Sequence, residues 1–127
     1  MLYSITQNSI VVLLNRLTIH LNHETQQATI VNSPGVRGNI VIPRYIIYLN
    51  IRFPVTKISQ FAFRSIRRLN SIEFEEKSNI QNIECHAFIN AKNIRKITLP
   101  DNVIDIEGFF FSELTIPINE IMITTQS

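Results

Sequence analysis

The chain has 127 residues, of which 45% are hydrophobic and 17% are charged, a composition that excludes a disordered segment and fits one folded domain. Its net charge of +2 gives little electrostatic attraction toward nucleic acid or an anionic membrane. The single cysteine, Cys85, excludes a disulfide within the chain, and we interpret it as a small packed residue.

The N-terminal part, residues 1–54, is expected to be a β-rich capping segment. Residues 10–14 form a five-residue apolar run, which is too short for a secretory signal or a spanning helix and predicts a buried strand or short helix. Two β-prone runs at 18–21 and 28–31 surround a polar turn and predict a β-hairpin. Residues 40–42 predict a further strand that ends at a proline. No membrane insertion is expected.

One pattern of apolar residues then appears twice in full, with corresponding positions 25 residues apart. A third copy begins with Ile106 and Phe111 and is degenerate. We divide this part into repeats at 55–79, 80–102 and 103–121, followed by a tail at 122–127. A period of this size is typical of leucine-rich repeats, in which each unit adds one short strand to a parallel sheet. The two full copies consist of Ile58, Ala62, Phe63, Leu69, Ile72 and Phe74, and of Ile83, Ala87, Phe88, Ile94, Ile97 and Leu99.

Alternation within each copy locates the strands of the predicted sheet. In the first copy, Ile72 and Phe74 point inward and Glu73 points outward, because side chains alternate between the two faces of a strand. The second copy has the same alternation around Thr98. Residues 58–63 and 83–88 have their apolar positions five apart, which is too sparse for a long helix. They are expected to form turns or short helices on the back of the solenoid.

The pattern resembles the BspA-type leucine-rich repeat, whose unit runs Ile, four residues, Ala-Phe, a polar stretch, then Leu-x-x-Ile-x-Leu-Pro. The second copy follows it from Ile83 through Ala87-Phe88 to Pro100, whereas the first copy has Glu75 in place of the proline. The resemblance implies a β-rich leucine-rich-repeat solenoid with an N-terminal hairpin cap. It also implies a cell-surface or extracellular protein that takes part in adhesion. Because residues 1–9 contain no Lys or Arg for a signal peptide, a cytoplasmic location is the alternative.

No constellation of residues predicts catalysis, a cofactor or a metal. His20 and His23 lie three apart, so within a strand they would face opposite sides, and no further ligands accompany them at zinc-site spacing. Three glycines provide no phosphate-binding loop. The sequence therefore favours a protein that is not an enzyme.

The outward side chains of the repeat strands are the candidate protein-binding residues. Neighbouring repeats would place Glu73 beside Thr98 and Thr115, and Ser71 beside Lys96, on a surface of the kind that repeat proteins use for binding. The expected partner is a protein, for which the resemblance implies a host or matrix protein. The exposed end of a short solenoid also predicts self-association.

Two alternatives remain open. A basic protein associated with nucleic acid would use Lys57, Arg64, Arg67 and Arg68. A fragment of a longer array would have no independent role, because fewer than three complete repeats are near the minimum for stability.

Overall fold

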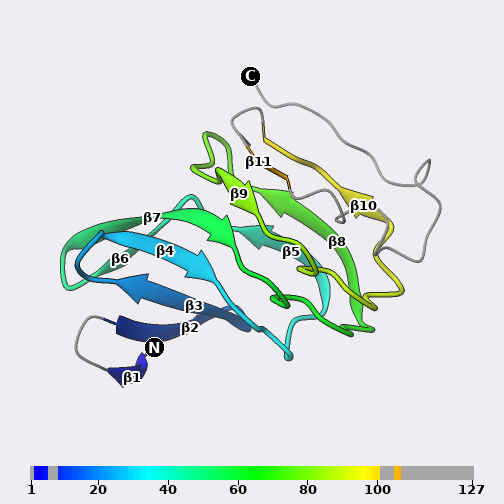
Figure 1. Ribbon diagram of the computed structural model, residues 1–127, viewed down its shortest axis with the longest axis horizontal. Helices are drawn as coiled ribbons and strands as arrows, with labels where there is room; N and C mark the ends of the chain where they lie inside the picture. Colours follow the sequence, from blue (N-terminus) through cyan, green and yellow to red (C-terminus); the bar gives the residue numbers. More distant parts are fainter. Residues whose placement is uncertain (1, 6–8, 101–104, 107–127) are drawn as a thin grey trace.

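The computed structural model describes residues 2–5, 9–100 and 105–106, with the first and last of these ranges described by their backbone. In these residues the regular structure consists of strands (Figure 1). They are β1 (Leu2–Ile5), β2 (Ser9–Leu14), β3 (Leu17–Asn22), β4 (Gln27–Ile30), β5 (Gly38–Ile42), β6 (Tyr45–Tyr48), β7 (Ile51–Ile58), β8 (Leu69–Phe74), β9 (Asn82–Ile83), β10 (Lys96–Ile97) and β11 (Asp105–Ile106).

The strands form two main sheets. The larger has the order β1-β2-β3-β4-β7-β9-β11, and the smaller has the order β10-β8-β5. In the larger sheet, β1, β2, β3 and β4 pair antiparallel in succession, whereas β4, β7, β9 and β11 pair in parallel in succession. All pairs of the smaller sheet are parallel. In Figure 1 the smaller sheet lies beside the repeat strands of the larger one, and the connecting turns run between them. This is a β-rich repeat solenoid.

Both sheets contribute to one hydrophobic core. The β3–β4 hairpin buries Ile19 and Ile30 as a cross-strand pair, and Ile58 and Ile83 continue this row on β7 and β9. On the smaller sheet, the buried Ile72 lies beside Ile97 on β10. Each strand covers only a narrow strip of core, so stacking of successive units is what removes the apolar side chains from water.

The predicted hairpin at 18–21 and 28–31 is confirmed as β3 and β4, and the strand at 40–42 is confirmed as β5. Residues 10–14 belong to a strand, β2. The division at residue 54 stays a prediction, although β4 and β5 pair directly with the repeat strands β7 and β8.

The back of the solenoid contains turns at residues 60–65 and 85–90, together with a parallel sheet that the sequence did not predict. The turns repeat in their backbone as well as in their sequence. Phe61 and His86 both have φ near +60°, as do Ser65 and Asn90. Each turn hydrogen-bonds to the next, because the Phe63 amide donates to the Ala87 carbonyl at 2.7 Å. The third copy begins as expected, with Ile106 of β11 beside Ile83.

A second hairpin, β6–β7, was not predicted from the sequence. Its two-residue turn consists of Leu49 and Asn50, which have φ of 50° and 63°. Such turns usually contain asparagine or aspartate followed by glycine, because these residues tolerate positive φ. A leucine at the first position removes that signal.

Candidate protein-binding surface

The candidate surface is the outer face of the smaller sheet, formed by β5, β8 and β10. Ser71 of β8 pairs with Lys96 of β10, as the sequence predicted, and on its other side with Asn39 of β5. Glu73 pairs with Val41 of β5. The three strands therefore carry their outward residues in aligned rows.

Glu73 and Lys96 form the charged part of this surface. The Lys96 ammonium lies 4.0 Å from a Glu73 carboxylate oxygen, and about half of each side chain is exposed. Because both groups are exposed to water, their attraction to each other is weak, and both can still interact with a bound protein. Thr98 is half-buried just beyond β10, where its amide donates to the Ile72 carbonyl at 3.0 Å.

Ser71 differs from the other candidates because it is only 9% exposed. Its hydroxyl donates to the side-chain oxygen of Asn39 at 2.8 Å, so its role at the surface is to hold Asn39 in place. Thr115 and Phe111 of the third copy lie outside the described residues.

A shallow hollow of about 500 Å³ follows this face. Of the predicted residues, Ser71, Glu73 and Lys96 line it. The sequence did not predict the rest of its lining, which consists of Asn39, Ile40, Val41, Asn70 and Arg95. Val41 is 52% exposed, an unusual position for a valine and one that adds apolar area to a charged surface. The alternation of residues 40–42 could have revealed it, had these residues been recognised as a strand beside β8.

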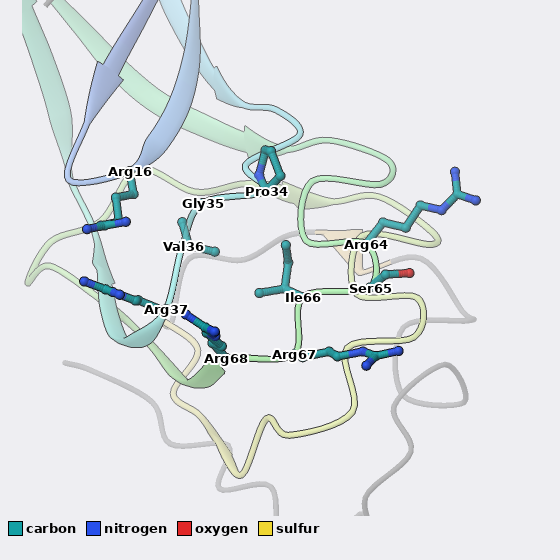
Figure 2. A pocket seen from close by; sticks show the side chains of 10 residues that line it. All are labelled: Arg16, Pro34, Gly35, Val36, Arg37, Arg64, Ser65, Ile66, Arg67 and Arg68. Carbon is teal, nitrogen blue, oxygen red and sulfur yellow. The ribbon is translucent and has the colours of Figure 1, made fainter.

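The basic residues considered for nucleic-acid binding are divided by the structure. Arg64, Arg67 and Arg68 line one hollow (Figure 2), but Lys57 does not belong to its lining. The Lys57 ammonium lies instead 4.0 Å from the Glu84 carboxylate.

The described residues contain no group of three or more His, Cys, Asp or Glu side chains placed to hold a metal. His20 forms a hydrogen bond of 2.7 Å with the Ser9 hydroxyl, and His23 is exposed in the β3–β4 turn. Within the ranges that the structure covers, no helix has the length and apolarity needed to cross a membrane.

The stacked repeats and the parallel pairing of their strands in both sheets define a leucine-rich-repeat protein. Residues 44–127 match the family described as "BspA type Leucine rich repeat region (6 copies)", and the chain belongs to this family. The repeats of this family are generally scaffolds for protein–protein interaction. No curated protein is significantly similar in sequence to the chain.

Two solved structures share the fold. One is a leucine-rich repeat protein from Bacteroides capillosus, with a TM-score of 0.56 and 19% identity over 92% of this chain and 99% of that one. The other is a leucine rich cell surface protein from Faecalibacterium prausnitzii, with a TM-score of 0.57 and 24% identity. The similarity to the second covers 99% of this chain but only 33% of that protein.

Proposed function

We propose that this chain is a non-enzymatic protein-binding module of the adhesion type, and that it binds its partner through the outer face of β5, β8 and β10. The observation that carries the proposal is that Val41 pairs with Glu73 across β5 and β8, and that the Lys96 ammonium of β10 lies 4.0 Å from the Glu73 carboxylate. Apolar area and both signs of charge then lie on one surface, a combination that suits a protein partner better than a single-sign polymer.

The family supports this function because its repeats generally serve as interaction scaffolds. A cell-surface setting is supported by the Faecalibacterium cell surface protein, which shares the fold. Labelling of intact cells with an antibody against the chain tests the setting separately from the binding.

The binding experiment is a proximity pull-down from cells that express the intact chain, compared with a variant carrying Glu73→Ala, Lys96→Ala and Thr98→Ala. A matched control carries Glu76→Ala, Lys77→Ala and Gln81→Ala, which likewise removes one acidic, one basic and one polar side chain at exposed positions. We expect specific proteins to be lost with the first variant and retained with the control. Retention of the same proteins by both variants would exclude this face as the binding surface.

A further inference from the structure

Five arginines surround a hollow of about 450 Å³ at one end of the smaller sheet, which we call the arginine pocket. They come from three separate loops: Arg16 from the β2–β3 turn, Arg37 from the segment before β5, and Arg64, Arg67 and Arg68 from the segment before β8. Figure 2 shows Arg16, Arg37 and Arg68 on one side of the pocket, whereas Arg64 and Arg67 extend to the opposite side. The sequence alone identified only the last three.

The pocket has an unbalanced positive charge. No acidic side chain belongs to its lining, and within the described part of the chain Arg16, Arg37 and Arg68 have no carboxylate within ion-pair distance. Its remaining lining is uncharged and includes the buried side chains of Val36 and Ile66. Guanidinium groups bind carboxylates and phosphates through paired hydrogen bonds, so an anionic group is the expected ligand.

The same region contains a free strand edge. The Gly38 amide donates to the Arg68 carbonyl at 2.6 Å, and the Ile42 carbonyl accepts from the Glu75 amide at 3.0 Å. These residues therefore direct their backbone groups toward β8. Because successive residues of a strand alternate their hydrogen-bonding side, Asn39 and Val41 direct their N–H and C=O groups away from β8. Among the described residues no strand pairs with that edge.

A groove connects the free edge to the arginine pocket. It has a volume of about 410 Å³ and lies between the β2–β3 turn and β5. Arg16 and Arg37 line both the groove and the pocket, so the two hollows are adjacent. Asn39, Ile40 and Val41 form the β5 side of the groove.

We propose that an extended acidic segment of a protein partner adds as a strand to the free edge of β5 and places its carboxylates on Arg16, Arg37 and Arg68. Strand addition supplies main-chain hydrogen bonds, and side-chain pockets then select the sequence. Acidic residues at every second position would face the arginines together, because alternate side chains share one face of a strand. Nucleic acids and glycans lack a peptide backbone and cannot pair with Asn39 and Val41 in this way.

This inference names a partner class for the proposed protein-binding function. It relies on the backbone edge of β5 and on Arg16, Arg37 and Arg68, whereas the sheet-face proposal is tested on side chains of β8 and β10, so each can fail without the other. The variant with Glu73→Ala, Lys96→Ala and Thr98→Ala should bind an acidic peptide as the natural chain does. Failure of the sheet-face experiment would therefore leave the peptide result intact.

The probe is a fluorescent eight-residue peptide in which Glu and Thr alternate, and the measurement is fluorescence anisotropy with the full chain in low salt. We expect the combined substitution Arg16→Ala, Arg37→Ala and Arg68→Ala to weaken binding at least tenfold. The control, Arg52→Ala, Lys77→Ala and Lys92→Ala, removes the same charge at exposed positions elsewhere and should change binding less than twofold.

Backbone pairing is tested on the peptide, which leaves the fold of the protein untouched. One version carries N-methyl groups on the odd-numbered residues and another on the even-numbered residues. Only one of the two sets of amides can face β5, so one version should lose binding and the other should keep it.

Four results would overturn the proposal. They are absence of peptide binding, equal binding of both N-methylated versions, tighter binding of single-stranded DNA of equal charge, and a dimer in light scattering that is dispersed by Val41→Pro. The last result would mean that a second copy of this chain occupies the edge.

Discussion

Phe63 and Phe88 stack on each other in the core with ring centroids 5.2 Å apart and planes inclined by 20°, although 25 residues separate them in the sequence. Both side chains are buried. The Phe63 amide also donates to the carbonyl of Ala87, the residue before Phe88. Together the two contacts fix the offset between consecutive repeats. The phenylalanine position of the repeat thus takes part in both the aromatic contact and the backbone hydrogen bond between neighbouring repeats.

Replacement of Phe88 by alanine should lower the free energy of unfolding by about 3 to 5 kcal/mol, since it removes a buried ring from a packed core. Chemical denaturation followed by circular dichroism measures this loss. Phe88→Leu is the conservative control and should cost much less. A near-neutral Phe88→Ala variant would contradict the repeat alignment. With Phe63→Ala in a double-mutant cycle, we expect a coupling of about 0.5 to 1.5 kcal/mol between the stacked rings.

Ser33 joins the N-terminal hairpin to the first repeat turn. Its buried hydroxyl accepts from the Thr18 amide at 2.9 Å and donates to the Val31 carbonyl at 2.7 Å, and its amide donates to the Ala62 carbonyl. Ser33→Ala should destabilise the chain by about 1 to 3 kcal/mol, because it leaves buried polar groups without a partner. Exposed Ser65→Ala is the comparison and should cost far less; equal losses in thermal unfolding would argue against the role of the Ser33 hydroxyl.

Arg16 has a φ of 69° in the two-residue β2–β3 turn, a conformation that glycine adopts with less strain. Arg16→Gly should therefore stabilise the chain by about 0.5 to 1 kcal/mol, since asparagine-glycine is a favoured pair for such a turn. The same change should weaken binding of the acidic peptide. A thermal scan and a peptide titration on one sample test both statements. A destabilised variant would show that the arginine side chain contributes more to folding than its backbone strain costs.

The Glu73–Lys96 ion pair should contribute little to stability, because both side chains are about half exposed. Glu73→Gln and Lys96→Gln should each change the free energy of unfolding by less than about 0.5 kcal/mol. Urea denaturation of both variants measures this directly. A loss above 1 kcal/mol would assign the pair a structural role and weaken the case for a binding surface.

Much of the architecture could be predicted from the spacing of apolar residues along the sequence. The 25-residue offset predicted the repeats, and the alternation around Glu73 predicted which side chains of β8 point inward. The neighbourhood of Ser71 and Lys96 also followed, because stacked repeats place equivalent positions side by side. These features depend on local strand geometry, and the same residue pattern indicates that geometry in each repeat.

Other features could not be read in this way. β5 lies 32 residues before its partner positions on β8, since the β6–β7 hairpin lengthens that connection and hides the repeat. The burial of Ser71 depends on Asn39, a contact between distant segments.

The sequence by itself determined the class of fold, the repeat length and the inward and outward faces of the repeat strands, because each of these depends on side-chain periodicity along one segment. Only the tertiary structure decided that Arg16, Arg37 and Arg68 surround one hollow and that β5 has a free edge beside them. These relations depend on which strands pair and on how three loops converge. The positions of the arginines in the sequence do not predict that they lie close together beside a free strand edge.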